Sequence, residues 1–175
     1  MIVLALDVSS VSTGWACLTD LKSKKIKSPV VKIKDFGCIS PKSSLATERL
    51  IMFESQLKNL IYESKPDLCV IEDLNYLRNM KVVKVLASFL GVAKKICYEY
   101  HKTEPFLIRR THALKQTIGN GDASKADVVK YIEDLFGVTL PKEGTEDIAD
   151  AILTGYCYIL ESKAGNTEGE DDGKK

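Results

Sequence analysis

The sequence has few of the residues from which small metal-stapled or disulfide-bonded domains are built. It contains two histidines, His101 and His112, and five cysteines, but no Cys-x-x-Cys pair. The cysteines are odd in number, widely spaced and mostly placed within apolar runs, which is typical of reduced core residues in an intracellular protein. A structural zinc site is therefore not expected.

Long hydrophobic runs are also lacking. No window approaches 18 uninterrupted apolar residues, and the apolar residues 2–6 follow no basic segment and lead directly into Asp7. This pattern argues against a membrane span and a signal peptide, so we expect an intracellular, cytoplasmic protein without a membrane partner. The 175 residues, 45% apolar and 28% charged, suit one globular domain with a sizeable core.

Apolar runs and turn residues predict three antiparallel strands at the start of the chain. Residues 2–7 form a continuous apolar run that ends in an acid, Asp7, and the small-residue turn 8–14 leads to a second run at 15–18. A lysine-rich turn, residues 22–27, separates these from residues 30–39, where apolar and charged side chains alternate as in a half-exposed strand.

The next elements alternate between helix and strand. Apolar residues recur at helical spacing over 45–61, with Ser43 or Ser44 as the N-cap and Pro66 as the stop. The run 68–71 reads as a buried strand ending in Glu72, residues 81–100 as an amphipathic helix, and residues 105–108 as a fifth strand. A strand reached through a helix is normally parallel to its neighbour, so the expected fold is a five-stranded mixed α/β sheet flanked by helices.

Two further helices and a tail complete the chain. Ser124 is expected to cap a helix over 125–136 that Gly137 ends, and Thr145 to cap a last helix running to about Ser162. Residues 163–175 are rich in glycine and acidic residues and hold no large apolar side chain. We therefore expect one domain over residues 1–162 and a disordered tail over 163–175.

Four acidic residues stand at the ends of these elements. Asp7 closes the first strand and Glu72 the fourth, while Asp147 and Asp150 share one face in the first turn of the last helix. Sites in open sheets form outside the strand ends, so the four carboxylates could converge. Each also has a plainer explanation, such as a turn cap for Asp7, a lysine pair for Glu72, or a favourable helix dipole for Asp147.

Four carboxylates around one point repel one another and make physical sense only with bound cations. Oxygen ligands without histidine or thiol select Mg²⁺ or Mn²⁺. Two such ions about 3.5–4 Å apart can activate water and stabilise the leaving oxygen of a phosphodiester. This combination predicts a nuclease.

Basic residues gather in the central part of the chain, which suits a polyanion-binding surface, although solvated helix faces explain such clustering about equally well. Residues 78–125 contain ten basic side chains against three acidic ones, in a chain of net charge +1. The basic set is Arg78, Lys81, Lys84, Lys94, Lys95, Lys102, Arg109, Arg110, Lys115 and Lys125.

The order of elements and acids resembles the ribonuclease H-like superfamily, and the local motifs resemble the RuvC Holliday junction resolvases over about residues 2–160. The motifs that carry this resemblance are Leu4-Ala-Leu-Asp7 with Thr13-Gly14, Val70-Ile-Glu72, Lys115-Gln-Thr-Ile-Gly119 with Ser124-Lys125, and Asp147-Ile-Ala-Asp150-Ala. Two departures are visible: Val8-Ser9 stands where the family usually has Pro-Gly, and Asn75 stands where it has an aromatic wedge, with Tyr76 as the substitute.

The resemblance implies a structure-selective DNA endonuclease that resolves four-way junctions by paired symmetric nicks. It implies that Asp7, Glu72, Asp147 and Asp150 hold two Mg²⁺ ions, which Mn²⁺ can replace, and that Lys115 and Lys125 act on the scissile phosphate. It further implies a homodimer on branched DNA, for which the helix 81–100 is the candidate interface, although packing on the sheet explains that helix equally well. The expected DNA contacts are Tyr76, Arg78, Lys81, Lys84, Arg109, Arg110, Lys115 and Lys125.

Three alternatives stay open at this level. A ribonuclease H-like nuclease acting on RNA/DNA hybrids or replication intermediates would use the same acids without a dimer. A catalytically inactive junction-binding protein would need the basic residues but not the acids. A fragment of an actin-like ATPase would also open with a strand, an aspartate and a small-residue turn, but needs a second domain to enclose nucleotide.

Overall fold

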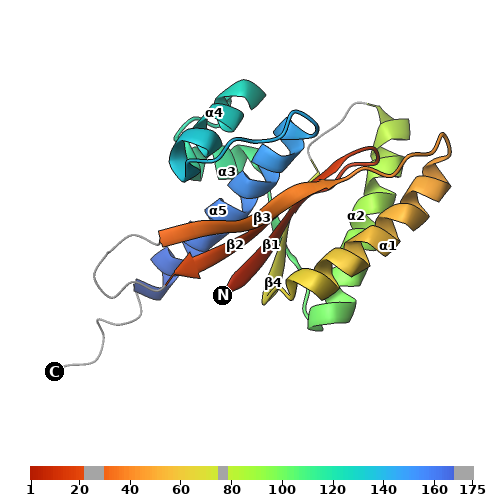
Figure 1. Ribbon diagram of the computed structural model, residues 1–175, viewed down its shortest axis with the longest axis horizontal. Coiled ribbons are helices and arrows are strands. Elements are labelled where there is room, and N and C mark those ends of the chain that lie inside the picture. The colour runs from red at the N-terminus through yellow and green to blue at the C-terminus, as the bar shows by residue number, and fades with distance from the viewer. Residues whose placement is uncertain (22–29, 75–78, 168–175) are drawn as a thin grey trace.

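The structure, a computed structural model, describes residues 1–21, 30–74 and 79–167. This part of the chain forms five strands and five helices, with three strands at the start and three helices at the end (Figure 1). Their bounds are β1 Ile2–Asp7, β2 Thr13–Leu21, β3 Val30–Ile39, α1 Ala46–Ser64, β4 Leu68–Glu72, α2 Met80–His101, β5 Phe106–Ile108, α3 Arg110–Thr117, α4 Lys125–Phe136 and α5 Thr145–Thr167.

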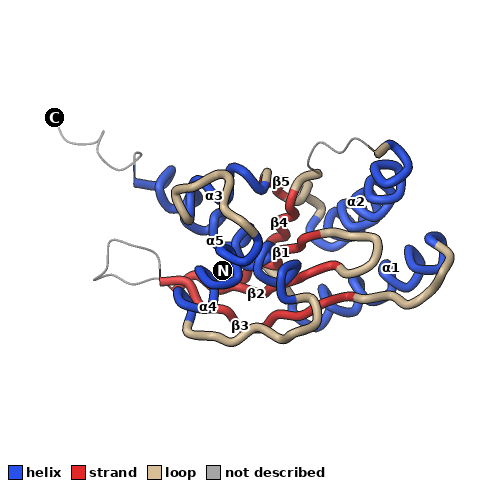
Figure 2. The backbone as a smooth tube through the Cα atoms, turned by 90° about the horizontal axis from the view of Figure 1, so that it is seen from above, coloured by secondary structure: helices blue, strands red, loops and turns tan. Residues whose placement is uncertain are grey.

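The strands form one mixed sheet in the order β3-β2-β1-β4-β5 (Figure 2). β1 pairs with β2, and β2 with β3, in antiparallel fashion, whereas β4 runs parallel to both β1 and β5. The expected five-stranded mixed sheet with three antiparallel strands first is thus confirmed. β1 lies at the centre, between β2 and β4, and the helix α1 carries the chain from the edge strand β3 to β4.

Helices cover both faces of the sheet. α1 and α2 pack on one face, and α3, α4 and α5 lie on the other (Figure 1). Successive side chains of β1 point to opposite faces, so Leu4 and Leu6 pack against Phe53 of α1 while Val3 and Ala5 pack against α5. This double burial explains why residues 2–6 read as a continuous apolar run.

The register of β1 and β4 brings their carboxyl ends to one edge of the sheet. Leu6 is opposite Ile71, so Asp7 and Glu72 follow side by side. The first turns of α5 and α2 flank the same edge from opposite faces (Figure 1). The edge therefore gathers residues from β1, β4 and α5.

Gly14 allows the start of α5 to reach this edge. Gly14 pairs with Asp7 in the sheet, and a Cβ at Gly14 would lie 2.0 Å from the carbonyl oxygen of Asp147. No real side chain tolerates that distance, so the approach of α5 to β2 requires glycine at this position.

Several boundaries differ from the expected ones. β2 is longer than 15–18 and includes Thr13 and Gly14, because it pairs with β1 down to Asp7. Leu45, not Ser43 or Ser44, is the N-cap of α1; the Ser43 hydroxyl instead accepts a hydrogen bond from the Leu45 amide. The last helix continues past Ser162 to Thr167, so the first residues of the expected tail are helical.

The other caps show one confirmation and one correction. Ser124 and Asp127 form a capping box at the start of α4, and Gly137 ends this helix in the left-handed conformation, as expected. Thr145 is not the N-cap but the first residue of α5, and its hydroxyl donates to the Pro141 carbonyl.

The helix α3 was not expected. Of its residues only Ala113 and Leu114 are buried, which is too few for an apolar stripe.

Some expectations fall outside the described residues, namely the lysine-rich turn 22–27, Tyr76, Arg78 and the tail beyond 167. Among the helices that the structure describes, none is both long enough and apolar enough to span a membrane.

Candidate active site

Three acidic side chains converge at the carboxyl edge of the sheet. One carboxylate oxygen each of Asp7, Glu72 and Asp150 lies within 4.8 Å of the other two. Asp7 ends β1, Glu72 ends β4, and Asp150 lies within the first turns of α5 with only 3% of its surface exposed. The expected convergence of these three acids is confirmed, and we call them the carboxylate cluster.

Asp147 lies beside the carboxylate cluster. It is half-buried in the first turn of α5, and its charge raises the pKa of both Asp7 and Asp150. The group of oxygens within 4.8 Å of one another does not include Asp147. Its role as a fourth metal ligand therefore stays a prediction.

The turn after Asp7 is held by side chains. The Thr13 hydroxyl accepts a hydrogen bond from the Ser9 amide at 3.1 Å and donates one to the Ser9 carbonyl at 3.0 Å. The Arg49 Nε donates to the Ser10 carbonyl at 2.8 Å. These contacts hold the turn that contains Val8-Ser9, and no pattern in the sequence indicated the contribution of Arg49, on α1.

Burial and mutual repulsion keep the carboxylate cluster from being fully ionised on its own. Burial and then the charges of Asp150 and Asp147 raise the pKa of Asp7 to about 7. Burial and then the charges of Asp7 and Asp150 raise the pKa of Glu72 to about 9. A bound divalent cation would offset this repulsion, and oxygen-only donors suit a hard one. The three residues could therefore hold a divalent metal.

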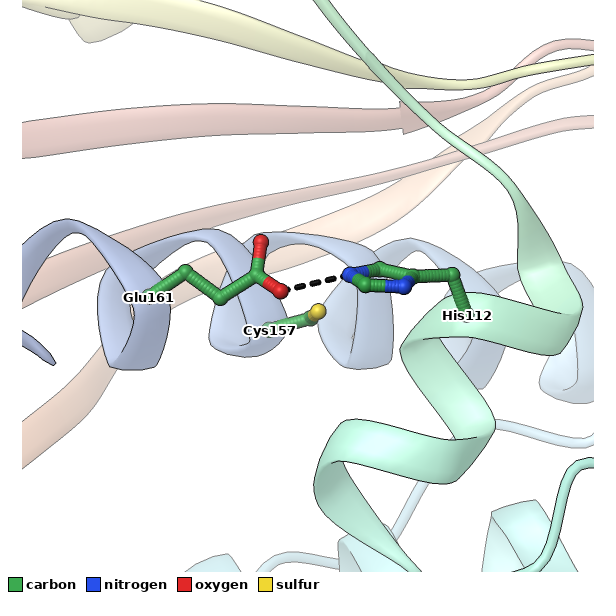
Figure 3. A group of neighbouring side chains, drawn as sticks. All are labelled: His112, Cys157 and Glu161. Carbon is green, nitrogen blue, oxygen red and sulfur yellow. Dashed lines mark hydrogen bonds and ion pairs between the residues drawn. The ribbon is translucent and has the colours of Figure 1, made fainter. Parts of the chain in front are cut away.

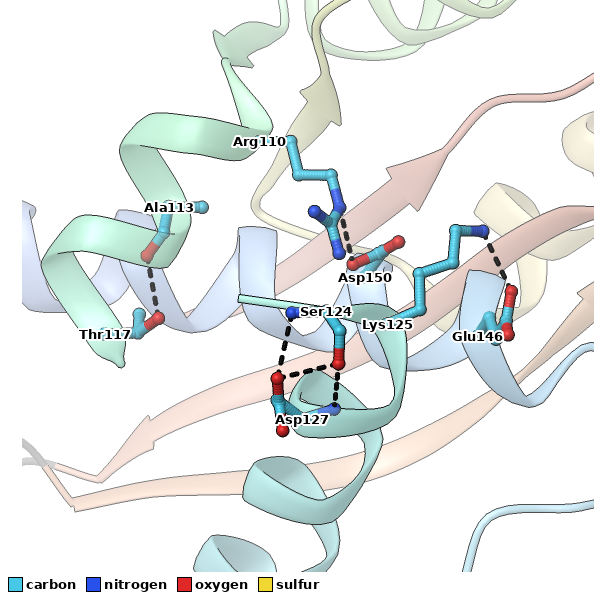
Figure 4. A network of polar contacts seen from close by, with 8 residues as sticks. All are labelled: Arg110, Ala113, Thr117, Ser124, Lys125, Asp127, Glu146 and Asp150. Atoms are coloured by element: carbon cyan, nitrogen blue, oxygen red, sulfur yellow. Dashed lines mark hydrogen bonds and ion pairs between the residues drawn. The ribbon is translucent and has the colours of Figure 1, made fainter. Parts of the chain in front are cut away.

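Two basic side chains, Arg110 and Lys125, border the carboxylate cluster, and Figure 4 shows both with Asp150. The Arg110 Nε donates to Oδ1 of Asp150 at 3.1 Å, and the Lys125 Nζ pairs with Oε2 of Glu146 at 3.0 Å. The charges of Arg110 and Lys125 lower the pKa of Asp7 and Glu72 against the larger raising effects. The negative charge of the carboxylate cluster is thus partly compensated by the positively charged side chains of Arg110 and Lys125.

Arg110 has a place that sequence analysis missed. It was expected only as a DNA contact, because α3 was not predicted and the chain after β5 read as a loop. In the structure Arg110 opens α3 directly after β5, whose Ile108 pairs with Glu72, so the guanidinium faces the acids. Its Nη2 is buried without a hydrogen-bond partner among the described residues, and a donor therefore remains for another ligand.

The remaining basic residues spread around the site. Lys81 and Lys84 are exposed on the first turns of α2, and Arg109 is exposed just before α3. Lys115 is exposed in the last turn of α3 and lines a cleft with Arg109. Their roles as DNA contacts stay predictions, as do those of Tyr76 and Arg78.

The chain matches a known family over most of its length. The family model described as crossover junction endodeoxyribonuclease RuvC matches residues 3–158. The protein of that name from Caldicellulosiruptor saccharolyticus is 29% identical over 174 residues, covering 94% of this chain and 95% of the relative. The one from Ehrlichia ruminantium strain Welgevonden is 30% identical over 166 residues, covering 94% and 99%.

Solved structures agree on the fold. Thermus thermophilus RuvC matches with a TM-score of 0.77 at 15% identity, covering 94% of this chain and 97% of that one. The same protein in complex with Holliday junction substrate matches with a TM-score of 0.78. The expected ribonuclease H-like fold and the resemblance are confirmed: this chain belongs to the RuvC family of crossover junction endodeoxyribonucleases.

Proposed function

We propose that this chain resolves Holliday junctions as an endonuclease whose metal ions are held by Asp7, Glu72 and Asp150, with Asp147 as the fourth ligand. Family membership supports the substrate and the reaction class. The observation that carries the proposal is the convergence of three carboxylates from β1, β4 and α5 within 4.8 Å. An inactive junction-binding protein would have no use for such a costly cluster.

Mg²⁺ is the proposed ion, with Mn²⁺ as a substitute and two ions in each site. The donor set of carboxylate oxygens suits either cation. When bound, such ions supply an activated water and stabilise the leaving oxygen of a phosphodiester. The protein contributes the spacing: β1 and β4 fix two carboxylates through their register, and Gly14 admits the helix that bears Asp147 and Asp150.

Lys125 and Arg110 are proposed to act on the scissile phosphate. The charges of both reach Asp7 and Glu72, which places them near any group bound there. The Nη2 donor of Arg110 is available to a phosphate oxygen, which arginine binds well. Lys115 is proposed to hold the same strand from the end of α3.

A homodimer is proposed to place two sites on the two strands of the junction. α2 buries Phe89 and Ala93 against the sheet, and it exposes Ala87, Ser88 and Gly91. A Cβ at Gly91 would meet nothing within 4 Å, so this strip is open and small enough for close approach of another helix. Symmetric dimers use the same patch on both copies, which suits a strip on one helix.

Cleavage of a synthetic four-way junction tests the proposal. A matched linear duplex and an RNA/DNA hybrid serve as competitors, each with Mg²⁺ and with EDTA. We expect paired symmetric nicks on the junction alone, lost with EDTA. Cutting of the hybrid instead would keep the metal site and move the function to the first alternative, and tight binding without cutting would favour the inactive junction-binding protein. An ATPase fragment is no longer an alternative, since the family match spans residues 3–158.

A further inference from the structure

A second group of potential metal ligands lies between α3 and α5, away from the carboxylate cluster. It consists of His112, Cys157 and Glu161, whose ligand atoms all lie within 4.8 Å of one another. The His112 Nε2 and Oε1 of Glu161 are 2.5 Å apart, and the Cys157 thiol points toward the gap between them (Figure 3). Cys157 and Glu161 are one turn apart on the same face of α5.

Two members of the group are exposed to solvent and the third is buried. The side chains of His112 and Glu161 are 48% and 42% exposed, and both line a cleft of about 440 Å³. Cys157 is fully buried beneath them as part of the core between α5 and the sheet. A cation entering through this cleft would meet the nitrogen and the oxygen first and the sulfur below.

We propose that His112, Cys157 and Glu161 form a transition-metal site that takes Zn²⁺. One nitrogen, one sulfur and one oxygen donor are the set that zinc accepts with tetrahedral geometry, and three protein ligands leave the fourth position to water from the cleft. Thiolate and imidazole donors favour zinc over Mg²⁺. This site therefore differs in chemistry from the carboxylate cluster.

The charges and distances fit a bound Zn²⁺. A thiolate and a carboxylate together neutralise the ion without help from solvent. Zinc bonds of about 2.0–2.3 Å place tetrahedral ligand atoms roughly 3.3–3.8 Å apart, so the His112–Glu161 pair has to open by about 1 Å. Binding replaces the thiol proton of Cys157 with the metal, and that proton leaves to solvent.

The site would join the two helices that carry the active-site side chains. Asp150 and Cys157 are separated by about 10 Å along α5, at 1.5 Å per residue. His112 lies in the first turn of α3, whose first residue, Arg110, contacts Asp150. Bound Zn²⁺ would hold α3 against α5 and so fix Arg110 beside the carboxylate cluster.

His112, Cys157 and Glu161 do not belong to a short sequence motif, so the sequence did not indicate a zinc site. His112 and Glu161 are 49 residues apart, and the chain has no Cys-x-x-Cys pair to mark a ligand set. Only the packing of α3 on α5 brings the three side chains together.

The test is a titration of the full-length protein with Co²⁺, a spectroscopic substitute for zinc, in excess Mg²⁺ to occupy the carboxylate cluster. A sulfur-to-cobalt charge-transfer band reports coordination by a thiolate, which the carboxylate cluster cannot give. We expect one Co²⁺ per chain with this band, displaced by Zn²⁺, and a melting temperature that rises with Zn²⁺.

Variants assign the ligands. His112→Gln and Glu161→Gln change exposed side chains, so they are expected to fold, and each should weaken Co²⁺ binding at least tenfold. Cys157→Ser should remove the band. His101→Gln, which changes the other histidine, is the matched control and should bind as the parent does. Absence of the band in the parent protein, or its survival with unchanged affinity in His112→Gln, would overturn the proposal.

Discussion

The guanidinium of Arg110 lies 3.1 Å from the carboxylate of Asp150, with 20% and 4% of the two side chains exposed. The positively charged side chain of Arg110 thus contacts one member of the carboxylate cluster. Because Asp150 is buried beside Asp7 and Glu72, this hydrogen bond stabilises the acids in the absence of metal. Arg110 therefore compensates the negative charge of Asp150 when no metal is bound, and a divalent cation would compensate it when metal is bound.

Arg110→Gln is expected to destabilise the metal-free protein by about 2 kcal/mol, since it removes a charge-assisted hydrogen bond to a buried carboxylate. The loss should be smaller in saturating Mg²⁺, because the cation takes over the charge. Urea unfolding with EDTA and with Mg²⁺ measures both values. Arg109→Gln, which changes an exposed neighbour, is the control. Equal stability of the Arg110 variant and its parent in EDTA would contradict this role.

The sheet and its acids could be predicted from the sequence because they depend on local patterns. Residues 2–7 and 68–72 are apolar runs that each end in an acid, and a strand joined through a helix is normally parallel to its neighbour. These facts place Asp7 and Glu72 at strand ends, and their meeting depended on the two strands being neighbours, which the pairing of β1 with β4 confirms. The small-residue turn before β2 also predicted a hairpin, although not that Gly14 is the residue that admits α5.

The parts that could not be predicted depend on contacts between distant segments. α3 buries only Ala113 and Leu114, so its helical pattern in the sequence is weak. Because this helix was not predicted, the position of Arg110 at its start could not be predicted either. The prediction that Ser43 or Ser44 caps α1 was wrong, because the helix starts at Ala46 and the Ser43 hydroxyl accepts from the Leu45 amide just before it. Arg49 reaches the turn after Asp7 across 39 residues, a distance over which composition carries no information.

Asp7→Asn is expected to abolish cleavage and leave junction binding intact, because it removes a metal ligand but no basic side chain. It should also stabilise the protein in EDTA by about 1 kcal/mol or more, since burial and neighbouring acids raise the pKa of Asp7 to about 7 and so disfavour its charge at neutral pH. Junction cleavage, gel-shift binding and unfolding in EDTA measure the three effects. Undiminished cleavage by the Asp7→Asn variant would contradict the assignment of Asp7 as a metal ligand.

Lys125→Ala is expected to slow cleavage by about 100-fold with a smaller loss of junction affinity, because its charge reaches the carboxylate cluster. Lys115→Ala should likewise slow cutting more than it weakens binding. Lys58→Ala, on α1 and paired with Glu54, is the matched lysine control. Single-turnover rates and dissociation constants separate the effects; an equal fall in both for Lys115 would move it from catalysis to DNA positioning.

Gly91→Arg is expected to convert a dimer to a monomer without harming the fold. Nothing lies within 4 Å of a Cβ at Gly91, so the new side chain starts from an open position of its own chain and would block a second copy on the same strip of α2. Analytical ultracentrifugation measures the mass, and Asn59→Arg, on the exposed face of α1, is the control. A dimer that persists in Gly91→Arg would place the interface elsewhere.

Gly14→Ala is expected to lower the free energy of unfolding by about 3 kcal/mol, because its methyl group would lie 2.0 Å from the carbonyl oxygen of Asp147 and must push α5 away from β2. The same displacement moves Asp147 and Asp150 away from Asp7, so stabilisation by Mg²⁺ should also shrink. Gly91→Ala adds the same methyl group where there is space and should stabilise the protein by about 0.5–1 kcal/mol through helix propensity. Thermal unfolding of both variants with and without Mg²⁺ tests the pair, and a Gly14→Ala protein that keeps the full Mg²⁺ response would show that the approach of α5 to β2 does not set the geometry of the site.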